Sequence, residues 1–497
     1  MAFNYMLNGV PDLDQRWDAL PKNGAMYCVP AAFTNWMYYY LAHGRTNAVL
    51  YGSGHSNHIP LNIGKMGDYM DTDADDGTSA SDAMEGLVDW MEDRDVPGIV
   101  YGRYATDNDN CTYVLLRNKL QAGCHIVVFR GRYKKDDGEF ERIGGHAMTL
   151  VGLQRTDDGT ITMSVRNPNN DGNINTQADS HLQQVDVDEK QRNIEGDNVT
   201  ILRWGPESVN PPYLCIDGWM AIKPLFGLTN VSAKAMTSYS IDIPTGKVTT
   251  KNFDLPFDGG IDDLALDPSD FFATVISKSS GEVWMLSLLD GAWSLLADIR
   301  SAKRVTYGGR RRQRLFVVQG QQIHAFDQEG KHVDQFDAGV DIDAISFDDK
   351  ENRLIAAISQ GSRVLSLTPA LKLLGSVECP AVAGTGRLSL SVNGRDQTIT
   401  LSRQGANEIS TLRWKANGVL SVGRFRLQAE GATSAIHVTR KGVMHLSEAG
   451  KIATYDGDGV RLSGSLLNGL PAGPLLKIAR SSNALDEERS RRKGHRN

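Results

Sequence analysis

The stretch "GGHAMTLVGLQRTDDGTITMSVRNPN", residues 144–169, predicts two neighbouring antiparallel strands. Its β-rich runs, "HAMTLVGLQ" and "TITMSVRN", are separated by the polar turn "RTDDG". If strands joined by so short a turn pair, His146 at the start of the first and Asn167 at the end of the second lie side by side. We expect the Asn167 oxygen to accept the imidazole N–H of His146 and to hold the ring in one orientation.

A cysteine earlier in the chain would be the group that such a base activates. In "GAMYCVPAAFTNWMYYYLAHG", residues 24–44, apolar side chains recur at helical spacing and predict a helix from Val29 to His43. Cys28 stands at the N-terminus of this helix, where the helix dipole favours a thiolate. Thiols placed in this way near a histidine commonly have pKa values of about 3.5 to 7.5. The order Cys, His, Asn predicts a nucleophile, its base and a residue that orients the base.

These segments resemble the papain-like family typified by bacterial double-glycine leader peptidases, which process bacteriocin precursors. The similar segments are "VPDLDQRWDALPKNGAMYCVPAAFTNWMYYYLAHG", "GGHAMTLVGLQ" and "ITMSVRNPN", within residues 10–170. The resemblance implies that Cys28 is the nucleophile, His146 the general base and acid, and Asn167 the orienting residue. It also implies that the Gln15 side chain donates to the oxyanion. In the family the glutamine stands nearer the cysteine, and an aspartate is commoner than an asparagine at the orienting position.

We interpret residues 1–230 as an α+β papain-like domain. Further helices are predicted from about Ser81 to Asp93 and from about Thr112 to Ala122. The β-rich runs "HIVVFRGRY", "HAMTLVGLQ", "TITMSVRN" and "NVTILRW" follow, with a polar insertion from Pro168 to Asp197. Helices first and an antiparallel sheet afterwards are typical of the α+β class.

Residues 236–481 have a different periodicity, which predicts an all-β domain, a five- or six-bladed β-propeller. Phase-matched strands begin 41, 40, 45 and 46 residues apart, at Asp263, Arg304, Ala344, Ser389 and Ala435. Four-stranded units repeated at such intervals are the signature of a propeller. The run "YSIDIPTGKVTTKNF" and a strand near Leu475 would form a sixth unit closed by both chain ends. A β-sandwich or a short solenoid is the alternative, and the charged residues 482–497 are expected to be disordered.

Composition and charge limit the partners that we expect. The chain has 497 residues, a net charge of −7 and a pI near 5.9, which argues against nucleic acid and anionic membranes as partners. The sequence shows no signal peptide and no apolar run long enough to cross a membrane. A cytoplasmic protein, or one exported without a cleavable signal, is therefore expected. The five cysteines form no CxxC pair, so neither a disulfide framework nor a structural zinc site is expected.

These observations predict a cysteine hydrolase, a bacterial thiol protease with a Cys-His-Asn triad that acts on a protein or peptide and needs no cofactor or metal. The propeller would bind the substrate or a partner protein. Two other interpretations remain open. One is a catalytically inactive interaction or scaffold protein, and the other is a glutamine deamidase or acyl-transfer effector with the same triad.

Other reactive side chains are better explained by structural roles. His55 and His58 in "GSGHSNH" would need further ligands to hold a metal. The aspartates of "DTDADDGTSASD" resemble an EF-hand loop, but its glycine is displaced, so we prefer a loop that leads into a helix. The basic cluster "GGRRRQR", residues 308–314, is a turn or a partner contact. Core packing is expected for His125, Cys111, Cys124 and Cys215.

Overall fold

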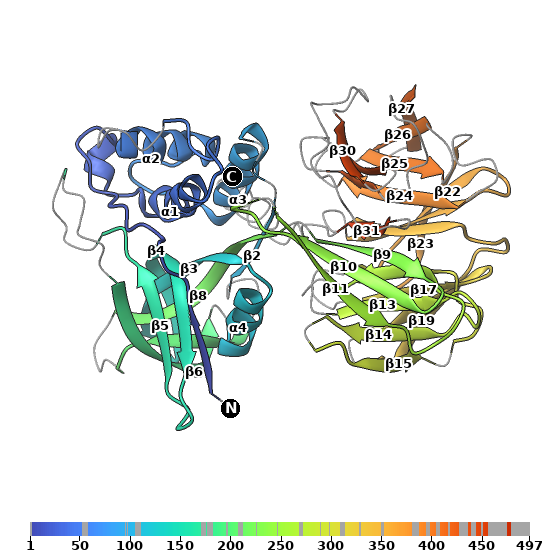
Figure 1. The fold of residues 1–497 in the computed structure, drawn as a ribbon, viewed down its shortest axis with the longest axis horizontal. Helices are drawn as coiled ribbons and strands as arrows, with labels where there is room; N and C mark the ends of the chain where they lie inside the picture. The colour runs from blue at the N-terminus through green and yellow to red at the C-terminus, as the bar shows by residue number, and fades with distance from the viewer. Residues whose placement is uncertain are drawn as a thin grey trace. The chain divides into compact units, whose positions relative to one another are not determined.

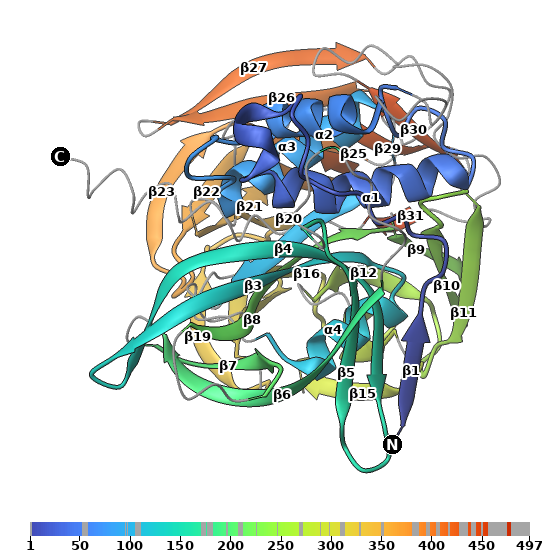
Figure 2. The ribbon, with the colours of Figure 1, turned by 90° about the vertical axis from the view of Figure 1, so that its left-hand side faces the viewer.

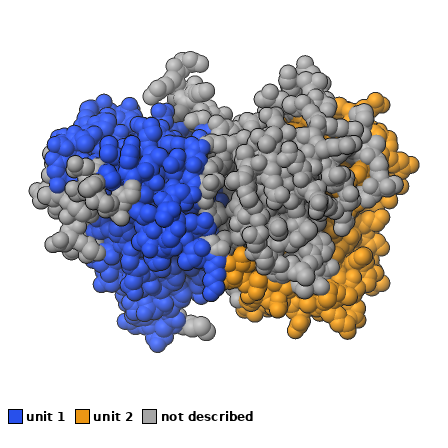
Figure 3. Space-filling model, turned by 45° about the horizontal axis from the view of Figure 1, so that its top comes forward, with its two compact units in different colours: residues 1–225, 241–247, 484–497 blue, residues 226–240, 248–483 orange. Residues whose placement is uncertain are grey.

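The chain forms two compact units, which Figure 3 colours separately. Unit 1 contains Met1–Leu225 and Ile241–Lys247, and unit 2 contains Phe226–Ser240 and Val248–Asn483. Unit 1 therefore includes a short segment from within the sequence that we assigned to the second domain. The computed structural model describes residues 2–478 except 52–57, 95, 97, 105–110, 170–174, 176–181, 195–196, 207–211, 225, 246, 268–271, 289, 298, 309–313, 328–329, 349–351, 380–386, 394–397, 404–407, 416–417, 427–435, 439–443, 449–450 and 456–474. The predicted tail, 482–497, lies outside the described residues.

The strands of unit 1 form one eight-stranded sheet that closes on itself (Figure 2). The sheet order is β1-β4-β3-β8-β7-β6-β5, and a further antiparallel pairing between β5 and β4 completes the ring. β2 pairs with β8 outside this path. The strands are β1 (Phe3–Met6), β2 (Ile99–Tyr104), β3 (His125–Asp136), β4 (Glu139–Arg155), β5 (Ile161–Arg166), β6 (Leu182–Ile194), β7 (Asp197–Trp204) and β8 (Tyr213–Lys223).

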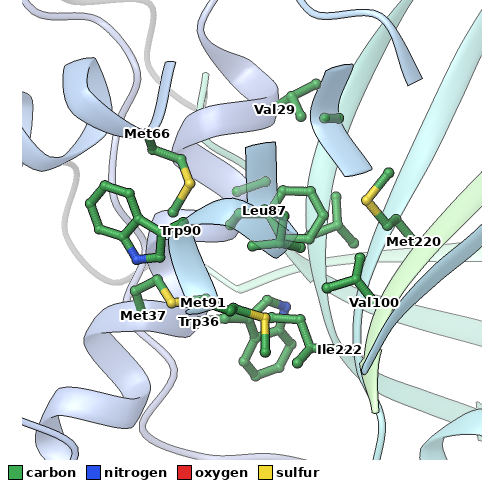
Figure 4. Close-up of a cluster of buried hydrophobic side chains, with 14 of the residues drawn as sticks. Val29, Trp36, Met37, Met66, Leu87, Trp90, Met91, Val100, Met220 and Ile222 are labelled. Carbon is green, nitrogen blue, oxygen red and sulfur yellow. The ribbon is translucent and has the colours of Figure 1, made fainter. Parts of the chain in front are cut away.

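The helices of unit 1 cover both faces of this sheet. They are α1 (Cys28–Ala42), α2 (His58–Tyr69), α3 (Ala80–Asp93) and α4 (Tyr113–Gln121), with a 3₁₀ turn, η1, at Pro21–Gly24. In Figure 4, Trp36 of α1 and Trp90 of α3 lie in one apolar cluster with Met220 of β8. Burying a large apolar side chain contributes roughly 2 kcal/mol, so this cluster holds α1 firmly on the sheet. α4 packs on the opposite face of the sheet, where Leu116 joins a second cluster with Met148. None of the helices in the described residues is long and apolar enough to cross a membrane.

Unit 2 is an arrangement of sheets like that of a β-propeller (Figure 1). The described residues contain five four-stranded sheets and one three-stranded sheet. The first sheet has the order β11-β10-β9-β31, so it takes strands from both ends of the unit, as the sequence predicts. The strands are β9 (Phe226–Ser232), β10 (Ala235–Ile241), β11 (Val248–Asp254), β12 (Ile261–Leu266), β13 (Phe272–Ser277), β14 (Val283–Ser287), β15 (Trp293–Ala297), β16 (Arg304–Gly308), β17 (Arg314–Gln319), β18 (Gln322–Phe326), β19 (His332–Asp337), β20 (Ala344–Asp348), β21 (Arg353–Ile358), β22 (Arg363–Leu367), β23 (Leu373–Glu378), β24 (Leu388–Asn393), β25 (Thr398–Arg403), β26 (Glu408–Lys415), β27 (Gly418–Arg426), β28 (Ile436–Val438), β29 (Met444–Glu448), β30 (Lys451–Tyr455) and β31 (Leu475–Ile478).

The predicted fold class, an α+β papain-like domain followed by an all-β domain, is wrong. Strands account for 51% of the described residues and helices for only 16%, and the strands of unit 1 close into a barrel. Local periodicity predicts the pairing of β4 with β5 but does not show the pairings of β8 with β3 and with β7, which are also needed to close the sheet. The polar insertion expected from Pro168 to Asp197 contains β6, whose outward-facing residues are polar and hide its strand character. α2 was not expected either.

His125 occupies a buried position between α1 and the sheet. Its Nδ1 lies 2.8 Å from the Tyr40 hydroxyl, and its ring stacks on Trp36 with centroids 4.6 Å apart. Burial lowers the pKa of His125 to about 4, while Asp242 raises the pKa and His43 lowers it further. The structure therefore agrees with the structural role that we expected for this histidine.

The lowered pKa of His125 predicts a loss of stability in mild acid. The folded state keeps His125 neutral down to about pH 4, whereas an unfolded histidine binds a proton below about pH 6.5. This contribution is complete above pH 6.5 and is lost as the pH falls toward 4. We expect the difference in Tm between pH 7.5 and pH 4.5 to be smaller in His125→Gln than in the wild type. Equal differences would contradict a neutral buried His125.

Candidate active site

Cys28 begins α1 at the edge of the helical core of unit 1. The side chain of the preceding residue, Tyr27, makes no capping hydrogen bond at this helix end. Pro30 falls in the first turn, where its missing N–H is not needed. Cys28 as a whole residue is partly exposed, and the backbone N–H groups of Cys28 and Val29 interact with its sulfur. The helix thus presents the thiol at its positive end.

Gln15 fixes the loop that leads into Cys28. Its Nε2 donates to the carbonyl oxygens of both Gly24 and Ala25, at 2.9 Å each, and its backbone N–H donates to Pro168 at 2.7 Å. Gly24 has φ +69°, and a Cβ there would lie 1.8 Å from the Gln15 carbonyl oxygen. Both side-chain donors of Gln15 are therefore used to hold the loop. A role as oxyanion donor would require at least one of these bonds to break.

The structure brings His146 and Asn167 together. β4 and β5 pair antiparallel with Thr149 opposite Arg166, which sets the end of β5 beside the start of the buried part of β4. His146 Nε2 lies 2.7 Å from Asn167 Oδ1. Asn167 Nδ2 in turn donates to Gln183 Oε1 at 3.0 Å, so β6 fixes which way the amide points. Because Nε2 faces an acceptor, Nδ1 is the ring nitrogen left to take a proton.

A buried polar contact attaches α1 to β4 near these residues. The Thr149 hydroxyl donates to the Ala32 carbonyl oxygen at 2.8 Å and accepts from Asn35 Nδ2 at 3.0 Å. The Cys28 sulfur consequently lies beside the backbone N–H of Ala147, the residue that follows His146. The structure thus places the Cys28 sulfur next to the strand that carries His146, whose ring contacts Asn167.

Burial controls the protonation of this site. It raises the pKa of the Cys28 thiol, and the N–H groups of Ala147, Val29 and Cys28 and the charge of Arg142 only partly oppose it. The lowered thiol pKa that the sequence predicts is therefore wrong, because desolvation of the thiolate outweighs the helix end.

His146 is also shifted by burial. Its pKa falls to about 4, against the opposing hydrogen bond to Asn167 and with the help of the Arg130 charge. At neutral pH the site therefore holds a protonated thiol and a neutral imidazole.

Arg142 lies beside the glycines that precede His146. A Cβ on Gly145 would lie 2.2 Å from Arg142 Nη2, so the glycine leaves room for the guanidinium. Arg142 Nε donates at 2.6 Å to the buried carboxylate of Asp217, which also accepts from the Tyr133 hydroxyl at 2.7 Å. Sequence reasoning missed Arg142, Asp217 and Gln183, because no local pattern indicates partners so far apart along the chain.

The other sequence candidates do not join this site. His55 and residues 309–313 of the basic cluster lie outside the described residues, and the His58 ring lies 5.7 Å from that of Tyr51. In the aspartate loop, Asp73 Oδ1 accepts from the N–H groups of Asp75 and Asp76 at 2.6 and 2.9 Å. Asp82 accepts from Ser79 at the start of α3 at 2.5 Å. Within the described residues, no three His, Cys, Asp or Glu side chains are grouped to hold a metal ion.

Comparisons with known proteins do not assign this site. No family model and no curated protein matches the chain. It is similar to a protein of unknown function from Bacteroides caccae, with 14% identity, 52% of this chain and 98% of that chain covered, and a TM-score of 0.39. It is also similar to a chain of a nidogen/laminin complex, with 13% identity, 52% of this chain and 99% of that chain covered, and a TM-score of 0.38. A functionally unknown protein from Desulfotomaculum acetoxidans has 13% identity, with 57% of this chain and 96% of that chain covered and a TM-score of 0.36. TM-scores this low support no statement about this chain.

The raised pKa of Cys28 predicts how its reactivity depends on pH. We expect alkylation of Cys28 by iodoacetamide, followed by peptide mass spectrometry, to rise steadily with pH through about 9, the ordinary thiol value. Cys215, whose pKa burial raises to about 12, is the internal control and should react more slowly throughout. A rate plateau between about pH 5 and 8 would instead indicate a thiolate–imidazolium pair.

Proposed function

We propose that this protein is a thiol-dependent hydrolase of proteins or peptides. In this proposal Cys28 is the nucleophile, His146 is the general base and acid, and Asn167 orients His146. The observation that carries the proposal is the 2.7 Å contact between His146 Nε2 and Asn167 Oδ1. His146 lies on β4, and the N–H of the next residue on this strand, Ala147, faces the Cys28 sulfur. A nucleophile near a base that is held by an orienting group is what covalent acyl transfer needs.

The chemistry follows from the protonation of the resting site. As the Cys28 sulfur attacks a carbonyl carbon, His146 Nδ1 takes the thiol proton, so the thiolate forms only when substrate is present. The same proton then passes from His146 to the leaving amine, and the carbon–nitrogen bond breaks. Water, deprotonated by His146, attacks the thioester carbonyl, and the carboxylic acid and the free thiol are released. The backbone N–H of Cys28, at the open end of α1, would donate to the oxyanion.

A peptide bond is the substrate that the sequence motifs favour. The segments around Cys28, His146 and Asn167 resemble those of double-glycine leader peptidases, and this resemblance is independent of the overall fold. The same three groups would also hydrolyse a glutamine amide or pass the acyl group to an amine. Unit 2, a broad set of loops on rigid sheets, would bind the substrate or a partner protein.

Two substitutions test the proposal. Cys28→Ala and His146→Ala should each lower turnover by at least about a thousandfold, and the double variant should be no worse than either, because the groups act as a unit. The matched controls are Cys124→Ala and His125→Gln, which change the same residue types outside the site and should keep activity while folded. The measurement is mass spectrometry of proteome digests, which separates cut peptide bonds from hydrolysed amides. Wild-type turnover in Cys28→Ala would end the proposal.

The orienting role of Asn167 gives a graded prediction. Asn167→Ala should keep partial activity, because His146 still accepts a proton but loses its fixed ring orientation. Gln183→Ala removes one of the contacts that fix the Asn167 amide and leaves the bond from the Asn169 N–H, so it should lower kcat less than Asn167→Ala and leave KM nearly unchanged. If Asn167→Ala lost more turnover than His146→Ala, the roles of the two residues would be wrongly assigned.

A further inference from the structure

Arg130 on β3 lies directly opposite His146 on the neighbouring strand β4. The two are register partners of β3 and β4, so their side chains leave the same face with Cβ atoms roughly 5 Å apart. The Arg130 guanidinium interacts electrostatically with both the Cys28 thiol and the His146 imidazole. A positive charge therefore lies beside the two groups that carry the proposed chemistry.

Among the residues that the structure describes, no carboxylate forms an ion pair with the Arg130 guanidinium. It lies over the Trp204 ring, 5.5 Å from the centroid, and its buried Nε has no hydrogen-bond partner among the described residues. Arg142, the other arginine near Cys28, differs because the buried carboxylate of Asp217 pairs with it. At neutral pH the protonated thiol supplies no counter-charge to Arg130 either. An arginine with an unpaired Nε and no carboxylate partner among the described residues is suited to bind an anion.

We propose that Arg130 is a specificity-determining residue that binds a carboxylate of the substrate next to Cys28. This inference rests on the proposed function and deepens it, since it names the class of substrate: an acyl donor that carries a carboxylate close to the bond under attack. The planar guanidinium fork matches a carboxylate in two parallel hydrogen bonds, and the Trp204 face fixes its plane. The carboxylate comes from an Asp or Glu side chain or from a chain end.

Two alkylating reagents measure this attraction without a known substrate. Iodoacetate and iodoacetamide react with the same Cys28 thiolate, forming the carbon–sulfur bond and releasing iodide, but only iodoacetate carries a carboxylate. Their rate ratio cancels the thiolate fraction, so a change in the Cys28 pKa does not affect it. We expect Arg130→Gln to lower the iodoacetate-to-iodoacetamide ratio about fivefold, the size of a partly exposed charge pair. Arg130→Lys, which keeps the positive charge, should keep most of the wild-type ratio.

Arg155 provides the matched control. It lies at the other end of β4, over the Tyr113 ring at 5.4 Å, so Arg155→Gln removes the same charge and the same kind of ring contact away from the site. The iodoacetate-to-iodoacetamide rate ratio of Arg155→Gln should equal that of the wild type. An unchanged ratio in Arg130→Gln, with a cooperative melt, overturns the proposal, and so does an equal fall in both variants.

Peptide pools then identify the source of the carboxylate. One pool has internal Glu or Asp and an amidated end, a second has no acidic side chain and a free carboxyl end, and a third has neither. Preference of the wild type for the first or the second pool identifies a side-chain or a terminal carboxylate, and Arg130→Gln should lose that preference. Equal cleavage of all three pools overturns the proposal.

Failure of this inference and failure of the proposed function give different results. If the hydrolase proposal is wrong, Cys28→Ala leaves turnover unchanged whatever Arg130 does. If only the Arg130 inference is wrong, Cys28→Ala abolishes turnover, but the iodoacetate-to-iodoacetamide ratio is the same in Arg130→Gln as in the wild type. If no pool is cut, the ratio alone still decides whether Arg130 attracts a carboxylate.

Discussion

The contact of Thr149 with α1 is the interaction on which the site depends. One buried hydroxyl donates to the Ala32 carbonyl and accepts from Asn35, and the Asn35 oxygen accepts from the N–H of Leu13 at 2.8 Å. These direct hydrogen bonds tie the helix, the strand and the N-terminal segment together at buried positions, where an unpaired polar group would be costly. The apolar cluster of Trp36 and Trp90 supplies most of the binding energy between helices and sheet, but apolar contacts tolerate sliding. The polar contact sets the register, and with it the place of Cys28 beside β4.

The sequence predicts the parts of this protein that depend on short-range patterns. The helix from Val29 to His43 follows from its apolar spacing, and the neighbouring positions of His146 and Asn167 follow from two strands joined by a short turn. The repeated strand starts predict the propeller-like sheets, and the strand near Leu475 joins the first strands of unit 2 in one sheet as expected. Its direct partner, β9, was not predicted as a strand.

What the sequence did not predict depends on partners that are distant along the chain. The closing of the sheet in unit 1 requires β8 to pair with both β3 and β7, and no local pattern records this. The strand of Gln183 looks like a polar insertion, because only a few of its side chains are buried. The prediction of a lowered Cys28 pKa was wrong for a related reason. The helix end is visible in the sequence, whereas burial of the thiol is a property of the packed unit.

The pairing of β31 with β9 affects the order in which the protein folds during synthesis. β9 leaves the ribosome early, yet its partner β31, at the edge of the first sheet next to β12 and β28, is made only after every other described strand of unit 2. Until residues 475–478 emerge, one edge of β9 stays unpaired and open to other chains. The catalytic candidates of unit 1 are complete far sooner, since Asn167 precedes β9 in the chain. A nascent chain therefore carries an assembled Cys28 site while its second unit still exposes a free strand edge, the stage at which binding by a chaperone is most useful.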